Sequence, residues 1–234
     1  MISLRPFARL GTFENDWLNA HYHFSFSDYH DPARMGWSVL RVWNDDTIRA
    51  GTGFPPHGHR DMEIVTYIRT GAITHEDGLG NRGRTVAGDV QVMSAGKGIT
   101  HAEFNLESED TTLFQIWILP KSGGIAPRWE TKRFPERQTL TSPTLTPLAS
   151  GLPEHAGQAL SIHQDAAILG ATLTAGDQVT HHLGSRRAYL VVARGRLRVN
   201  GAELGPRDGA AIEGEEDLRI EALEECELVL ADLP

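Results

Sequence analysis

The chain is poor in the features that mark secreted, membrane-spanning and nucleic-acid-binding proteins. Its 234 residues include one cysteine, Cys226, so no disulfide can form within the chain. No apolar run approaches the roughly 18 residues that a membrane helix needs, and the N-terminal sequence lacks the apolar segment of a secretory signal. The formal net charge of −9 disfavours non-specific contact with the phosphates of nucleic acids. We therefore expect a cytoplasmic protein that binds neither membranes nor nucleic acids.

Long helical periods are also scarce in this sequence. The 24 glycines and 12 prolines divide it into short segments rich in β-branched and aromatic residues. The pair Asn200-Gly201 between two such segments is typical of a two-residue hairpin turn. This spacing predicts an all-β fold, a sandwich or barrel. The expected strands cover residues 38–42, 63–68, 90–93, 112–119, 188–193, 218–220 and 227–231.

The sequence divides into two similar halves. Residues 139–157 are rich in proline, serine and threonine, which is typical of a linker. We therefore expect one β-domain over residues 1–138 and a second over residues 139–234. The second half repeats the spacing of the turn glycines in the first, but it has no His-x-His pair and no histidine after His182. A duplicated barrel whose second copy has no metal site is the resulting prediction.

Two clusters of possible metal ligands stand out in the first half. One contains His57 and His59, and the other contains His101 and Glu103. Residues two apart on a strand point to the same face, so each pair can direct two side chains at one point. Three imidazoles and one carboxylate are a suitable set for a transition metal that keeps open coordination positions. The spacing therefore predicts a metal site.

Glu63 is a second candidate carboxylate, four residues after His59. We favour Glu103 as the ligand because its spacing from His101 matches the first pair. Glu63 is then either a residue that orients a metal-bound imidazole or a structural hydrogen-bond acceptor. The remaining histidines that we considered are interpreted as structural. They are His21, His23, His75, His163, His181 and His182.

Two further features carry no chemistry in this interpretation. Residues 78–83 match the G-x-G-x-x-G pattern, but no helical segment follows them, so a tight turn is expected instead of a dinucleotide site. Cys226 lies among three glutamates, which disfavour its thiolate and make it a poor nucleophile.

The same residues resemble the two motifs of the cupin superfamily. Ser94 departs from the second motif, because it stands where proline is usual. The stretches 54–67 and 94–103 are similar to the pirin branch of that superfamily, and this likeness extends over residues 15–120. The matching motif residues are Gly51, His57, His59, Glu63 and Gly71, followed by Gly88, Gly96, His101 and Asn105.

The resemblance implies a bicupin, with two β-barrels of the jelly-roll type in one chain. It implies His57, His59, His101 and Glu103 as ligands of one divalent metal ion, with iron(II) expected and zinc, manganese, nickel, cobalt or copper as alternatives. Some pirins cleave flavonols such as quercetin with O₂ and release carbon monoxide. For this chain, the resemblance implies that activity, and Glu103 would act as the general base.

The resemblance also leaves a second function open. Other pirins are metal-containing, redox-responsive partners of transcription factors or metabolic enzymes, and this chain could be one of them. For the dioxygenase, we expect a largely apolar pocket for a flat aromatic substrate and a monomeric protein. The expected lining residues are Val65, Tyr67, Phe104, Phe114 and Gln115.

Overall fold

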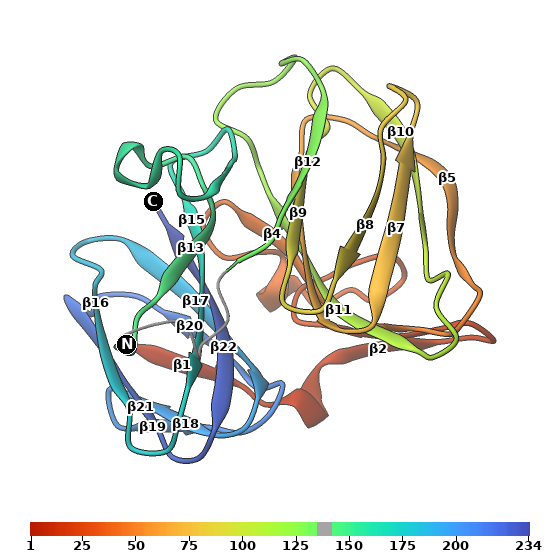
Figure 1. The fold of residues 1–234 in the computed structure, drawn as a ribbon. Coiled ribbons are helices and arrows are strands. Elements are labelled where there is room, and N and C mark those ends of the chain that lie inside the picture. Colours follow the sequence, from red (N-terminus) through yellow and green to blue (C-terminus); the bar gives the residue numbers. More distant parts are fainter. Residues whose placement is uncertain (135–141) are drawn as a thin grey trace. The chain divides into compact units, whose positions relative to one another are not determined.

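The computed structural model describes residues 1–134 and 142–234, and this part of the chain is built from β-strands (Figure 1). Its helices are three short 3-10 turns, and none of these could cross a membrane. The predicted all-β class is therefore confirmed. The 3-10 turns cover Phe7–Arg9, Pro32–Arg34 and Pro153–His155.

The strands form two compact units. The histidine unit contains Gly11–Phe134 and Leu160–Gln164. The C-terminal unit contains Met1–Leu10 together with residues 142–159 and 165–234. A single cut between residues 138 and 139, as expected from the sequence, falls outside the described residues. The expected first domain included residues 1–10, whereas the structure places Met1–Leu10 in the C-terminal unit.

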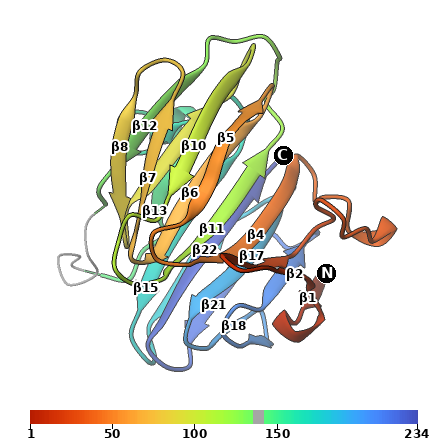
Figure 2. The ribbon, with the colours of Figure 1, turned by 90° about the vertical axis from the view of Figure 1, so that its right-hand side faces the viewer.

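The histidine unit has one large and one small antiparallel sheet (Figures 1 and 2). The large sheet has the order β12-β9-β6-β11-β4-β3-β2, and the small sheet has the order β5-β10-β7-β8. The strands are β2 (Gly11–Glu14), β3 (Leu18–Tyr22), β4 (Leu40–Ile48), β5 (Gly53–His59), β6 (Glu63–Thr70), β7 (Ala72–Asp77), β8 (Arg82–Val86), β9 (Val90–Ser94), β10 (Ile99–Phe104), β11 (Thr111–Ile118), β12 (Arg128–Lys132) and the short β14 (Leu160–Ser161).

The C-terminal unit repeats this topology. Its larger sheet contains the order β1-β20-β17-β22-β15-β13, and its small sheet has the order β16-β21-β18-β19, which matches β5-β10-β7-β8 strand for strand. The predicted duplication is therefore visible in the strand order. The strands are β1 (Ile2–Arg5), β13 (Thr146–Ser150), β15 (Ala167–Leu173), β16 (Gln178–His182), β17 (Arg187–Arg194), β18 (Leu197–Val199), β19 (Ala202–Leu204), β20 (Gly209–Ile212), β21 (Asp217–Ala222) and β22 (Cys226–Leu233).

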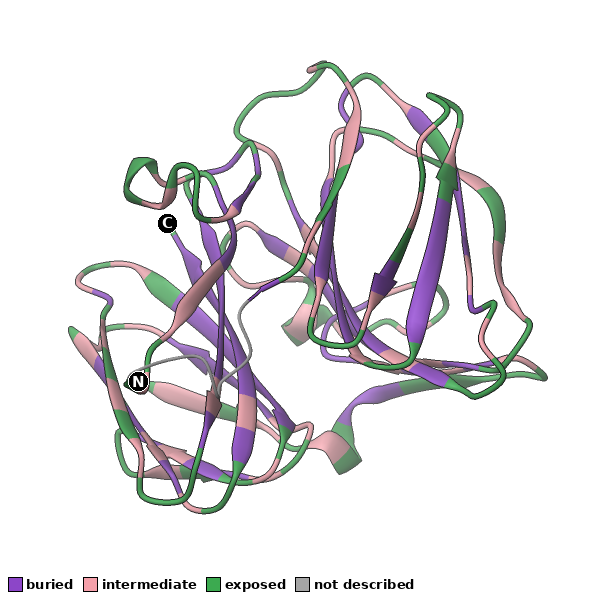
Figure 3. Ribbon diagram, in the orientation of Figure 1, coloured by how far each residue is buried: buried purple, intermediate pink, exposed green. Residues whose placement is uncertain are grey.

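The interiors of the two copies differ. In the C-terminal unit, apolar side chains from both sheets form one continuous core, which includes Leu190, Leu218 and Ile220. Leu218 and Ile220 lie on β21, the strand that corresponds to β10. In the histidine unit, a smaller apolar cluster around Ile68 and Leu113 occupies only part of the space between the sheets. Figure 3 shows the buried residues concentrated on the strands of both units.

Local turn chemistry follows the sequence in most places. Asn200 and Gly201 have φ values of 44° and 88°, as a type I′ turn between β18 and β19 requires. Within the glycine-rich stretch 78–83, residues 78–81 join β7 to β8 in a hairpin, so the expectation of a turn is confirmed. The strand expected at residues 38–42 begins later, at Leu40, because Ser38 has a positive φ of 52°. It continues to Ile48 through four consecutive polar residues, which the sequence pattern did not indicate.

Candidate metal centre and pocket

Two neighbouring strands of the small sheet bring three imidazoles together. On β5 and β10, His57 lies directly opposite His101, and His59 lies opposite Ile99. The ring centroids are 4.5 Å apart for His57 and His101, 4.8 Å for His57 and His59, and 5.0 Å for His59 and His101. One nitrogen from each ring lies within 4.8 Å of the others. Three imidazole nitrogens at this spacing fit a transition-metal ion.

The surroundings keep the imidazoles of His59 and His101 uncharged at neutral pH. Burial, reinforced by the neighbouring imidazoles, lowers the pKa of His101 to about 3 and that of His59 to about 4. The ring atoms His101 Nε2 and His57 Nε2 lie 3.1 Å apart. A neutral imidazole offers a lone pair, which a metal ligand must have. His59 and His101 therefore have the protonation state that metal binding requires at neutral pH.

Glu103 lies on the same strand, but its nearest partners are two amides. Gln91 Nε2 donates to one carboxylate oxygen at 2.5 Å, and Gln115 Nε2 donates to the other at 2.7 Å. The pairing of β10 with β5 shifts register between His101 and Glu103, so the carboxylate does not simply continue the row of imidazoles. Glu103 is 3% exposed, and burial raises its pKa despite the nearby imidazoles and the Gln115 hydrogen bond.

His75 is a residue of this centre that the sequence interpretation missed. It lies opposite Glu103 on β7, and with His101 and Glu103 it forms a second cluster that could hold a metal. Its Nδ1 is 3.3 Å from His101 Nδ1, and its Nε2 is 3.0 Å from Asp77 Oδ2. The signal was present in the sequence, because His75 and Asp77 form another pair with period two.

The position of His75 is fixed by a stacked tryptophan. Its ring lies parallel to that of Trp129, with centroids 4.8 Å apart and an interplanar angle of 7°. Gly83 on β8 allows this arrangement, because a Cβ atom there would lie 2.2 Å from Trp129 Cη2. Gly83, the last glycine of the G-x-G-x-x-G pattern, therefore leaves room for the Trp129 ring beside the centre.

Glu63 lies away from the imidazoles. The chain turns at residues 60–62, where Asp61 has a φ of 46°, so Glu63 does not continue the face of His59. Ser94 Oγ donates to Glu63 Oε2 at 2.7 Å, and His163 Nδ1 lies 3.4 Å from Oε1. Of the two roles considered for Glu63, the structural hydrogen-bond acceptor agrees with these contacts.

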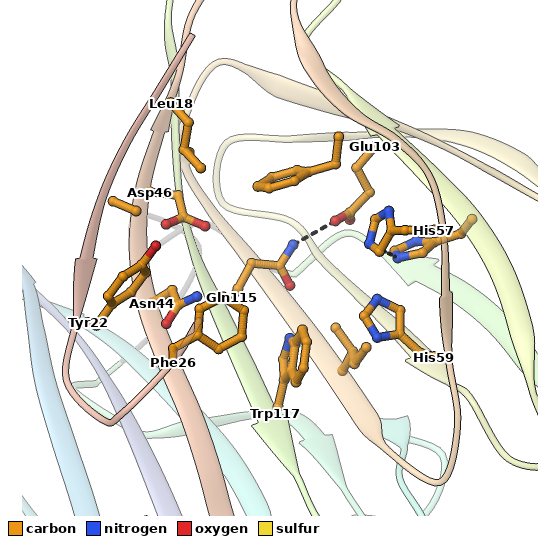
Figure 4. A pocket seen from close by; sticks show the side chains of 14 residues that line it. Leu18, Tyr22, Phe26, Asn44, Asp46, His57, His59, Glu103, Gln115 and Trp117 are labelled. Carbon is orange, nitrogen blue, oxygen red and sulfur yellow. Dashed lines mark hydrogen bonds between the residues drawn. The ribbon is translucent and has the colours of Figure 1, made fainter. Parts of the chain in front are cut away.

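A cavity of about 170 Å³ opens beside the imidazoles, between the two sheets of the histidine unit (Figure 4). Alternate residues of β3, β4 and β11 in the large sheet face it, such as Gln115 and Trp117 on β11. Most of its wall is aromatic or aliphatic. The lining residues are Leu18, Ala20, Tyr22, Phe26, Asn44, Asp46, Phe54, His57, His59, Ile64, His101, Glu103, Gln115 and Trp117.

The expected lining residues were largely wrong. Only Gln115 lines the cavity. Val65, Tyr67 and Phe114 have the opposite parity on β6 and β11, so they face the other side of the sheet, where the rings of Tyr67 and Phe114 stack 6.3 Å apart. Phe104 also lies outside the lining set, and its ring packs near Gly53.

A second polar group lies in this cavity, across from the imidazoles. Figure 4 shows Tyr22, Asn44 and Asp46 together on the wall formed by β3 and β4. Burial, together with Asp45 and Glu103, raises the pKa of Asp46 well above its ordinary value. Burial and the nearby Asp46 also raise the pKa of Tyr22 to about 12.

Several residues singled out in the sequence have structural contacts. Asn105, the last residue of the second motif, donates to the carbonyl oxygens of Ile48 and Glu109 at 2.9 Å, and so fixes the loop after β10. In the C-terminal unit, His181 lies 2.7 Å from an oxygen of Asp232. Cys226 is buried, and burial more than the neighbouring glutamates raises its thiol pKa to about 11.

Comparison with known proteins identifies the family of the chain. The family model described as pirin matches residues 4–118, and the one described as the quercetinase C-terminal cupin domain matches residues 148–233. A pirin-like protein of Caulobacter vibrioides is 58% identical over 233 residues, which cover 99% of each chain. This chain belongs to the pirin family.

Two matches from Escherichia coli, one to a named protein and one to a solved structure, extend this result. A protein named quercetin 2,3-dioxygenase, from strain K12, is 40% identical over 239 residues, covering 100% of this chain and 99% of the relative. The crystal structure of a bacterial pirin in complex with nickel(II) matches with a TM-score of 0.92 at 40% identity, covering 100% of this chain and 99% of that one. The predicted family and the bicupin fold are therefore confirmed.

Proposed function

We propose that this pirin is a metal-dependent flavonol 2,3-dioxygenase that cleaves quercetin-like substrates with O₂ and releases carbon monoxide. The observation that carries the proposal is the convergence of His57, His59 and His101 at the edge of a largely apolar cavity. An apolar cavity with a few polar groups suits a flat aromatic ligand. The name of the Escherichia coli relative supports the same activity.

His57, His59 and His101 would hold the metal ion, with Glu103 as the fourth ligand. The three imidazoles fit this role by their spacing and by the low pKa values of His59 and His101. When bound, such an ion would acidify the 3-hydroxyl group of a flavonol as a Lewis acid. Iron(II) is the expected metal, and the nickel in the related crystal structure makes nickel the first alternative, followed by zinc, manganese, cobalt and copper.

Glu103 would also accept the proton of the substrate's 3-hydroxyl group. Its carboxylate is buried, and its raised pKa makes it a stronger base than an exposed glutamate. The amides of Gln91 and Gln115 hold one oxygen each, so the carboxylate is oriented before the substrate enters. The aromatic and aliphatic wall would position the rings and exclude water from the reacting carbon atoms.

The proposed activity can be tested directly. The purified protein is stripped with a chelator, reloaded separately with each of the six metals, and incubated aerobically with quercetin while carbon monoxide is measured. We expect release from at least the iron-loaded or nickel-loaded protein, and none from the stripped protein. Absence of carbon monoxide from every metal-loaded sample would rule out the dioxygenase.

Variants separate the roles of the residues in the centre. We expect His101→Ala to lose metal, because it removes an imidazole common to both candidate clusters. Glu103→Ala should lower turnover by about 10²- to 10⁴-fold, the usual contribution of a general base. Metal content and carbon monoxide release are measured on the same samples. A fully metallated Glu103→Ala protein with unchanged turnover would contradict both roles of Glu103.

The alternative function, a redox-responsive partner of a transcription factor or metabolic enzyme, would use the same metal centre with a protein surface instead of a substrate cavity. No contact in the described part of the chain favours it over the dioxygenase. Cytoplasmic location and a monomeric state stay predictions from the sequence.

A further inference from the structure

The floor of the cavity carries a row of polar side chains that crosses five strands. In the register of the large sheet, Tyr22 lies opposite Asn44, Asn44 opposite Gln115, Gln115 opposite Thr66, and Thr66 opposite Gln91. Asp46 stands two residues after Asn44 on β4 and faces the same cavity. Polar side chains at the centre of a sheet are costly to bury unless they are hydrogen-bonded.

One end of this row is satisfied within the protein. Gln91 and Gln115 both donate to Glu103. Thr66 Oγ1 donates to Gln115 Oε1 at 3.3 Å and accepts from Gln91 Nε2 at the same distance. This end is therefore a closed network that supports the metal centre.

The other end has acceptors without donors. Asn44 is 5% exposed and Asp46 is 2% exposed. Their buried oxygens Asn44 Oδ1 and Asp46 Oδ1 have no hydrogen-bond partner among the described residues. Figure 4 shows Asn44 and Asp46 on the cavity wall opposite the histidines. Gln115 lies between this pair and Glu103. Two buried acceptors that face one cavity can accept hydrogen bonds from the hydroxyl or amine groups of a ligand.

We propose that Asn44 and Asp46 form a recognition subsite for a ring hydroxyl group of the aromatic substrate. The inference rests on the proposed function, since it assigns the reacting end of a flavonol to the imidazoles and its other hydroxyl groups to this subsite. The wall between the two polar groups is aromatic and aliphatic, including Phe26, Phe54 and Trp117, and suits the flat rings that join the two ends of such a ligand. A buried site that hydrogen-bonds a hydroxyl group discriminates strongly against an analogue that lacks it.

Two ligands and anaerobic binding test this subsite. Quercetin carries several ring hydroxyl groups, whereas 3-hydroxyflavone keeps only the reacting one. Binding of each to the metal-loaded protein is followed without O₂ by quenching of tryptophan fluorescence. We expect the wild-type protein to bind quercetin at least about tenfold more tightly, because leaving a buried polar group without its hydrogen-bond partner costs about that much. Equal affinities, or binding of neither ligand, would overturn the subsite without any variant.

Variants then locate the preference. Asn44→Leu and Asp46→Leu should each reduce the ratio of the two affinities by about tenfold while 3-hydroxyflavone binding and metal content stay unchanged. Asp46→Asn keeps an acceptor oxygen and the shape of the side chain, so it should retain most of the preference. Thr47→Val is the matched control, because Thr47 follows Asp46 on β4 and has the opposite parity.

The outcomes distinguish this inference from the proposed function. An unchanged ratio in both leucine variants would overturn the subsite, and so would an equal loss for both ligands, since that indicates a structural role. If the leucine variants do not fold, the test uses the ratio of the two affinities in the wild-type protein and in Asp46→Asn. Both proteins should then prefer quercetin. A wild-type protein that prefers quercetin but releases no carbon monoxide with any metal would retain the subsite and lose the dioxygenase.

Discussion

Replacing His75 by phenylalanine tests whether this histidine orients a metal ligand or is one. Burial alone would raise the pKa of Asp77, but hydrogen bonds from His75 and Asn81 outweigh it and lower the pKa, so Asp77 is an anion that accepts from His75 Nε2. His75 Nδ1 is then a bare acceptor for the N–H of His101 Nδ1, 3.3 Å away. This chain of contacts leaves the lone pair on His101 Nε2, which faces His57.

The magnitude of the expected effect follows from burial. His75→Phe removes one hydrogen bond, worth about 0.5 to 1.5 kcal/mol, and leaves the N–H of His101 without its acceptor at about 1 to 3 kcal/mol. His101 is 3% exposed, so water cannot easily replace the lost partner. The lost hydrogen bond and the unpaired N–H are partly the same cost, so we do not add them. We expect a loss of about 1.4 to 2.8 kcal/mol, which corresponds to 10- to 100-fold in metal affinity, the usual effect of removing a residue that orients a metal ligand.

The assay is a competition titration of the stripped protein against a chelator of known affinity. Phenylalanine preserves the stacking on Trp129, so the thermal midpoint of the metal-free variant should change little. His163→Phe is the matched control, because the same chemical change is made at a histidine that contacts Glu63 and Ser94 instead of the imidazole cluster. An unchanged metal affinity in His75→Phe would refute the orienting role. A loss far beyond 100-fold would show that His75 is itself a ligand, in the cluster with His101 and Glu103.

Three further predictions concern single residues. The buried Cys226, with a pKa raised to about 11, should resist iodoacetamide at pH 8 in the native protein and react in urea; rapid labelling of the native protein would contradict its burial. The folded-state pKa of Asp46 is raised, so its contribution to stability is present below its ordinary pKa of 3.8 and is lost as pH rises through the folded value. Asp46→Asn should therefore gain stability relative to wild type as pH rises from 4 to 7, as measured by urea midpoints, and a constant difference would argue against the shift. Gly201→Ala should lower the free energy of unfolding by about 1 kcal/mol, because the glycine has a φ of 88° in its turn; no loss would mean that the turn can change type.

The imidazole cluster could be predicted from the sequence because it depends mainly on the spacing of residues within single strands. Two residues on one strand share a face, and His57, His59 and His101 needed only the pairing of two strands to meet. The partners of Glu103 were not predictable in this way. They depend on a register shift between His101 and Glu103 and on amides from β9 and β11, which are fixed by long-range pairing.

The wall of the cavity was missed for a different reason. Strands β6 and β11 are buried on both faces, so their sequences are nearly continuous apolar runs in which parity cannot be read. A difference of one residue separates Phe114, which faces away, from Gln115, which lines the cavity. The polar residues within such runs were the better indication of the cavity side. The same holds for Asn44 and Asp46, which lie on β4 beyond the end of the expected strand and face the cavity.

The first strand of the chain has a consequence for how the protein is made. Strand β1 pairs with β20, so Ile2 lies opposite Ile212 and must wait for a partner synthesised about 200 residues later. Until then, β1 is an unpaired segment at the beginning of the chain, and β20 without it would expose its backbone amides and carbonyls along one edge. Sequence separation of this kind slows folding, because a long loop must close before the pairing stabilises it. The C-terminal unit therefore needs a strand that precedes the histidine unit in the chain, and the second half of the chain alone cannot complete it.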